Sequence, residues 1–87
     1  MADTQTVAEI AAHFSAMDDS VALINATAAD DADALAMYGS AAEVKLMVTR
    51  NTDHLELQAT HSWYSDSSKS KTPYTGAVTA GKAYVAG

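Results

Sequence analysis

The fold of this chain depends on one stretch, Ala41 to Trp63, which reads AAEVKLMVTRNTDHLELQATHSW. The stretch fits two incompatible structures. As a helix, it continues an apolar seam that advances by alternating steps of four and three residues, namely Met37, Ala41, Val44, Val48, Asn51 and Leu55. As a β-hairpin, it offers two alternating segments, Val44-Leu46-Val48 and Leu55-Leu57-Ala59, on either side of a turn at Arg50-Asn51-Thr52-Asp53.

Three features favour the helix. The seam stays in phase across the supposed turn, and the turn lacks the Asn-Gly or Asp-Gly pair that tight hairpins prefer. The helix predicted before this stretch also needs an equally long partner to cover it. The weak helix formers within residues 48–53 favour the hairpin instead. We therefore predict an all-α fold, with an α+β fold that carries a β-hairpin at 43–60 as the alternative.

The strongest periodic signal in the chain precedes this stretch. Its apolar residues follow steps of three and four in the order Val7, Ile10, Phe14, Met17, Val21 and Ile24. This period predicts a helix over about 6–27, with Phe14 as its largest buried side chain. Thr4 or Thr6 can cap the helix, and Glu9 lies three residues after Thr6, which is the spacing of a capping box.

The remaining segments complete a helical domain. The polar segment 25–33 is short enough to turn the chain back, which predicts two long antiparallel helices over about 6–27 and 31–63. The sequence SDSSKSK at 65–71 predicts a flexible loop. Thr72-Pro73 then predicts the start of a short C-terminal helix over about 73–86. We expect the whole chain, 1–87, to form a single small domain.

The composition limits the classes of partner. With 48% hydrophobic and 18% charged residues, the chain is globular rather than disordered. Its net charge is −6, so nucleic acid is not an expected partner. Residues 1–44 hold eight acidic and no basic residues (−8), and residues 45–87 hold five basic and three acidic residues (+2). Such a chain can pack its halves together or stack with copies of itself, although a solvated acidic surface also explains the charge. No apolar run is long enough to suggest a membrane span.

The residues that could carry chemistry form no recognisable site. The chain has no cysteine, which excludes disulfides and thiol catalysis. His54 and His61 are seven residues apart, further than zinc ligands on one helix usually are, and with His13 they are expected at the surface. The acidic residues at 30, 31 and 33 lack the glycine and ligand spacing of a calcium loop, so helix capping is expected there, with weak divalent binding as the alternative. We predict no catalytic, cofactor-binding or metal-binding residue, and no enzyme.

A second apolar stripe predicts an interface. It comprises Leu35, Ala42, Leu46, Leu57 and Tyr64. Because the short C-terminal helix can cover only part of it, we expect an oligomer or a larger assembly, with Leu46, Leu57, Trp63 and Tyr64 at the contact. Trp63 can instead close the core of the single chain. Asn51 is either partly exposed or a polar residue that sets the register of an oligomer.

Two short motifs suggest a relationship. Arg50-Asn51 followed by His54-Leu55-Glu56-Leu57, and the C-terminal AGKAYVA at 80–86, resemble small uncharacterised proteins encoded by tailed bacteriophages. The resemblance implies a capsid, neck, tail or accessory protein, in the virion or the host cytoplasm, with no catalytic residues to carry over. The predicted function is therefore a non-enzymatic structural or interaction protein that binds itself or other virion proteins. The alternative is an acidic inhibitor or antitoxin-like module that binds a basic site on a host protein.

Overall fold

The computed structural model describes residues 5–87, which form helices and no strand. The helices are α1 (Val7–Ala29), α2 (Ala32–Tyr38), α3 (Ala41–Gln58), α4 (Ser62–Ser65) and α5 (Thr72–Ala86). About 81% of the described residues are helical, so the predicted all-α fold is confirmed and the alternative hairpin at 43–60 is wrong. The supposed turn at residues 50–53 lies within the continuous helix α3.

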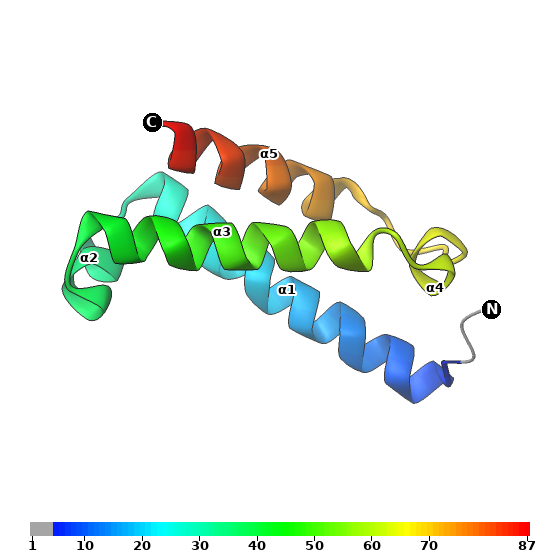
Figure 1. Cartoon of the computed structure of the whole chain (residues 1–87). Coiled ribbons are helices and arrows are strands. Elements are labelled where there is room, and N and C mark those ends of the chain that lie inside the picture. The colour runs from blue at the N-terminus through cyan, green and yellow to red at the C-terminus, as the bar shows by residue number, and fades with distance from the viewer. Residues whose placement is uncertain (1–4) are drawn as a thin grey trace.

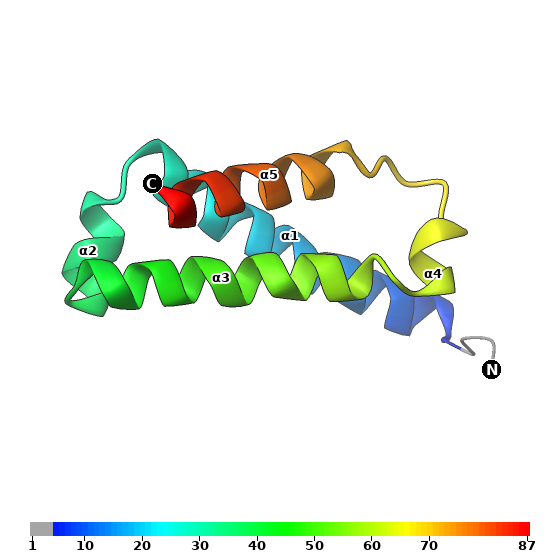
Figure 2. The same ribbon diagram turned by 45° about the horizontal axis from the view of Figure 1, so that its top comes forward.

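The three longer helices, α1, α3 and α5, contact one another in all three pairs. Figure 1 shows that α1 and α5 run in one direction and α3 in the other, with α1 crossing behind α3 at an angle. The short helices α2 and α4 lie at opposite ends of the bundle, and the loop after α4 leads back to the start of α5 (Figure 2). The molecule is elongated, with principal extents of 41 × 21 × 20 Å.

The N-terminus of α1 is held by the predicted capping box. Thr6 Oγ1 accepts a hydrogen bond from the Glu9 backbone N–H at 3.1 Å, and Glu9 Oε1 accepts one from the Thr6 N–H at 2.8 Å. The hydrogen bond from the Thr6 backbone N–H to the Glu9 carboxylate, followed by a side-chain hydrogen bond from Thr6, holds the pKa of Glu9 below its ordinary value. Thr6 is therefore the cap, and Thr4 lies outside the described residues.

The predicted single helix over 31–63 is divided into three helices. Gly39 ends α2 in a left-handed conformation, with φ at +88°, which a side chain would strain. Ser40 then begins α3, because its hydroxyl accepts a hydrogen bond from the Glu43 N–H at 3.2 Å. At the other end, α3 stops at Gln58, and Thr60 donates both its N–H and its hydroxyl to the Leu57 carbonyl.

The first break changes which apolar residues reach the core. Val44, Val48 and Leu55 of the predicted seam are almost fully buried. Met37 belongs to α2, on the other side of the break, and it is 78% exposed rather than part of the seam. Leu35 is partly buried and packs against a small core formed by Val44, Met47 and Val48.

The larger core is an aromatic cluster at the end of the bundle near α4. Phe14 lies at its centre, with ring centroids 5.4 Å from Trp63, 6.0 Å from Tyr64 and 5.7 Å from Tyr74. Phe14 is thus the largest buried side chain of α1, as predicted. Val7 was expected in the same seam but is 87% exposed, because it is the first residue of α1, at the edge of the bundle.

The contact between α3 and α5 requires a glycine. A Cβ atom at Gly81 would collide with the hydroxyl oxygen of Thr52, which donates to the Val48 carbonyl at 2.8 Å. Gly81 therefore allows close helix packing at this point, rather than only weakening α5. Among the helices described between residues 5 and 87, none has the length and apolar character needed to cross a bilayer.

Candidate functional site

One face of α3 is left open by the other helices. It consists of Leu46, Arg50, Asp53 and Leu57, all of which are exposed, and it is called the outward face below. Asp53 lies at its edge and also borders the pocket between α3 and α5. Leu46 is 40% exposed and Leu57 is 63% exposed. These two residues are eleven positions apart, which brings them back to nearly the same side of the helix after three turns. The outward face thus combines two apolar side chains with one cation and one anion between them.

Trp63 and Tyr64, the other two predicted interface residues, lie inside the chain. They are 6% and 7% exposed, because the break at residues 59–61 and the short helix α4 direct them onto Phe14. Trp63 therefore closes the core of the single chain, which was the alternative to a place at an interface. The predicted interface set divides into a buried pair, covered by the chain itself, and an exposed pair, Leu46 and Leu57.

Further contacts hold the buried pair in place. Trp63 stacks with His13 at a centroid distance of 4.8 Å and with His61 at 5.7 Å. Both histidines are half-buried at the surface, and the His13 ring also contacts the exposed Gln5 side chain at 3.0 Å. The loop expected to be flexible also contributes, since Lys69 Nζ lies 5.8 Å from the centre of the Phe14 ring, and Lys71 Nζ lies 5.3 Å from that of Tyr64. These contacts connect the loop to the aromatic cluster.

A polar network joins α1 to α3. The Ser20 hydroxyl donates to Asn51 Oδ1 at 2.9 Å and lies 2.9 Å from His54 Nδ1. Since a hydroxyl has one hydrogen, His54 Nδ1–H must be the donor to Ser20, and His54 Nε2 is then the acceptor that faces the Gln58 amide nitrogen at 3.5 Å. Asn51 in turn donates to the Met47 carbonyl at 2.9 Å. The polar residue in the apolar seam is thus satisfied within the single chain.

The serine–histidine contact is not arranged for nucleophilic catalysis. Ser20 is 4% exposed, and its hydroxyl hydrogen is directed to Asn51, so a substrate has no access to this oxygen. His54, expected at the surface, is half-buried because its ring contacts the buried Ser20 hydroxyl on the facing helix. Ser20 was not among the predicted core residues, although Met17, Ser20, Ile24 and Thr27 follow the helical steps of three and four, and all four are buried.

The acidic residues near α2 make structural contacts. Asp30 Oδ1 accepts a hydrogen bond from the Ala32 N–H at 3.0 Å, two residues further along, at the start of α2. Asp31 precedes α2 but makes no side-chain capping bond, and its Oδ2 instead accepts a hydrogen bond from the Tyr84 hydroxyl at 2.9 Å. Within residues 5–87, no three histidine, aspartate or glutamate side chains are grouped as they would be to hold a metal ion.

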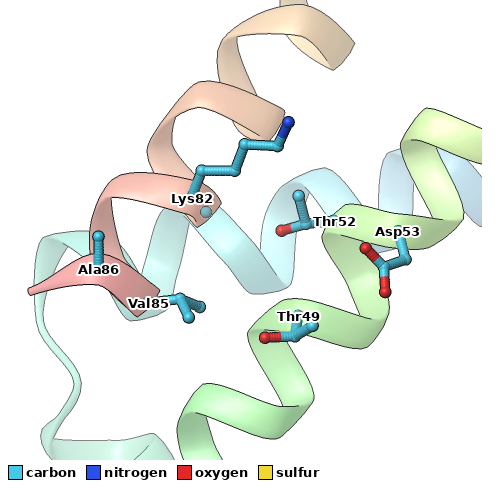
Figure 3. A pocket seen from close by; sticks show the side chains of 7 residues that line it. Thr49, Thr52, Asp53, Lys82, Val85 and Ala86 are labelled. Atoms are coloured by element: carbon cyan, nitrogen blue, oxygen red, sulfur yellow. The ribbon is translucent and has the colours of Figure 1, made fainter.

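A small pocket of about 230 Å³ lies between α3 and α5. Figure 3 shows Thr49, Thr52 and Asp53 on α3 across from Lys82, Val85 and Ala86 on α5. The hydroxyls of both threonines donate to carbonyls of their own helix, and Lys82 Nζ is engaged by Glu56 Oε2 at 2.8 Å. Both hydroxyls are therefore committed to their own helix and the Lys82 ammonium already has an anionic partner, so nothing in the pocket identifies a ligand.

Comparison of this chain with protein-family models, with curated proteins and with solved structures found no match.

Proposed function

We propose that this protein is a small, non-enzymatic structural or interaction protein that binds copies of itself, or other proteins of an assembly, through the outward face of α3. The observation that carries the proposal is the exposure of Leu46 and Leu57 on one face of a helix whose other large apolar residues are buried. Exposed apolar side chains that share one surface commonly mark a protein contact. The resemblance of residues 50–57 and 80–86 to tailed-bacteriophage proteins supports the more specific role of a capsid, neck or tail component.

The size of the contact indicates weak pairwise binding. Full burial of a leucine side chain contributes about 1.5–3 kcal/mol, and bringing two proteins together costs about 4–15 kcal/mol. Two partly exposed leucines per chain therefore gain no more than the lower end of this cost, which makes the contact between two chains weak. Such a contact becomes effective when many copies are held close together, because linked binding sites raise the effective concentration. This behaviour suits a component of an ordered assembly.

Sedimentation velocity between micromolar and millimolar concentration tests the proposal. The native chain is expected to associate as its concentration rises, and Leu57→Glu is expected to shift it to the monomer. Met37→Glu is the matched control, because Met37 is even more exposed, at 78%, but lies on α2, outside the outward face. A native chain that stays monomeric at millimolar concentration contradicts self-association, and equal effects of the two variants contradict the choice of face. If the chain is encoded by a phage, mass spectrometry of purified particles tests the virion role directly.

The alternative, an acidic inhibitor or antitoxin-like module, is favoured by the charge of the first half of the chain. Asp18 and Asp31 there accept hydrogen bonds from tyrosines. Asp19, Asp33 and Glu43 are exposed and accept none from a tyrosine of the described residues. Binding to a basic partner through these carboxylates would weaken as salt is added. Binding through the outward face would depend less on salt. Sedimentation at low and high salt, with and without a basic host partner, distinguishes the two functions.

A further inference from the structure

The outward face of α3 is self-complementary. Its order along the chain is Leu46, Arg50, Asp53 and Leu57, with spacings of four, three and four residues. When the row is read from Leu57 back to Leu46, the spacings are the same. The two leucines then exchange places, and Arg50 exchanges places with Asp53. The centre of the pattern lies between Asn51 and Thr52. A surface with this property can contact a copy of itself related by a two-fold axis.

The helix geometry presents the four residues together. At 100° per residue, they fall within an arc of about 60° on the helix surface, and at 1.5 Å per residue they span roughly 16 Å. The helix is continuous through all four positions. They therefore form a narrow row along one side of a rigid element, with a leucine at each end and the charges in the middle.

The two charged side chains of the row are available for a partner. Neither Arg50 nor Asp53 has a hydrogen-bond or ion-pair partner within residues 5–87. The nearest basic side chain on the packed helix α5, Lys82, is taken by Glu56 at 2.8 Å. Within the part of the chain that the structure describes, the two charges are thus exposed and unpaired, while the rest of the row is apolar.

We propose that two copies of this chain bind each other by antiparallel packing of their α3 helices about an axis between Asn51 and Thr52. In this dimer Leu46 of each copy contacts Leu57 of the other, and Arg50 of each copy pairs with Asp53 of the other. A parallel arrangement in the same register would place like charges opposite each other. The inference rests on the proposed function and deepens it, because it names the partner and fixes the geometry.

Charge reversal in separate chains tests the pairing. Arg50→Asp places carboxylates opposite one another in the dimer, and Asp53→Arg does the same with guanidinium groups. Each variant alone is therefore expected to raise the dimer dissociation constant roughly tenfold, through the two symmetric contacts. An equimolar mixture of the two variants restores opposite charges at both contacts. It is expected to form heterodimers with the native dissociation constant, measured by sedimentation equilibrium.

Cross-linking tests the direction of the helices. Because the native chain has no cysteine, single cysteines can be introduced without other changes. A short bis-maleimide is expected to link Leu46→Cys chains to Leu57→Cys chains in a mixture, while each variant alone links poorly, since its two copies of the thiol lie about 16 Å apart along the axis. Strong linking within each variant alone would overturn the antiparallel arrangement.

The outcomes separate this inference from the proposed function. If the native chain associates and Leu57→Glu weakens association, but mixing the two charge variants restores nothing, the antiparallel dimer is wrong and the outward face remains a binding surface. If the native chain is monomeric at millimolar concentration, the dimer and the self-association part of the proposed function are both wrong. Circular dichroism of every variant confirms that the helical fold is kept, so a lost contact is not confused with unfolding.

Discussion

The hydroxyl of Ser20 in α1 donates to the Oδ1 of Asn51 in α3 at 2.9 Å, across thirty-one residues of sequence. His54 lies at the same distance from this hydroxyl, so the oxygen of Ser20 is shared by two side chains of the facing helix. Polar groups that are satisfied only in one alignment oppose a slip of one helix along the other. We therefore expect the Ser20–Asn51 contact to contribute to the register of α1 and α3 as well as to stability.

Replacing Ser20 by alanine tests this contact. Ser20→Ala leaves Asn51 Oδ1 and His54 Nδ1 without their partner in a half-buried position, and is expected to cost about 1–3 kcal/mol of unfolding free energy. Ser15→Ala on the same helix is the matched control, because Ser15 is exposed and its replacement brings the same gain in helix propensity. Urea unfolding followed by circular dichroism measures both. A Ser20→Ala variant as stable as Ser15→Ala would show that the network contributes nothing.

Two glycines of α5 are expected to respond in opposite directions to alanine. Gly76 has open space where a Cβ would lie, so Gly76→Ala should stabilise the helix by about 0.5–1 kcal/mol. Gly81→Ala introduces a collision with the Thr52 hydroxyl and should destabilise by about 1–3 kcal/mol, despite the same propensity gain. Thermal unfolding of the two variants measures the difference.

The double variant Gly81→Ala with Thr52→Ala identifies the cause. It removes the oxygen that the new methyl group would meet, so part of the lost stability should return relative to Thr52→Ala alone. No recovery would mean that the contact between α3 and α5 at this point is limited by something other than the Thr52 side chain.

Buried tyrosines should make the fold sensitive to high pH. Burial, followed by the hydrogen bond that its hydroxyl donates to Asp18 at 2.7 Å, raises the pKa of Tyr74 well above its ordinary value, and burial raises the pKa of Tyr64. The folded state therefore holds these protons more tightly than the unfolded state does. Their stabilising effect is complete below the unfolded tyrosine pKa of about 10 and is lost as the pH rises above it.

We expect alkaline unfolding in which tyrosinate absorbance and loss of helical signal occur together. Tyr74→Phe removes one of the ionisations that oppose folding, so it should move the alkaline midpoint to higher pH. At neutral pH the same variant should cost about 0.5–1.5 kcal/mol for the lost hydrogen bond to Asp18. If all tyrosines ionise near pH 10 while the helical signal is unchanged, the described burial of Tyr74 is wrong.

Local pattern was enough to predict most of the helices. The steps of three and four from Val7 to Ile24 require a helix whatever it packs against, and Thr6 with Glu9 sets its start. The same periodicity in Ala41–Gln58 favoured a helix over the hairpin, and the structure confirms the helix. It also placed Leu46 and Leu57 on one open face, because both belong to one uninterrupted helix. These features depend on residues a few positions apart, and the sequence contains that information directly.

The end of each helix and the partners across the bundle were decided only by the tertiary structure. Gly39 can weaken a helix or end it, and it ends α2 because the chain must turn there to pack Leu35 against the core of Val44, Met47 and Val48. Trp63 and Tyr64 become buried because α4 turns them onto Phe14, some fifty residues earlier in the chain. The contacts of Ser20 with Asn51 and of Gly81 with Thr52 likewise join helices that are distant in sequence. Such contacts follow from how closely whole helices approach, which no local period specifies.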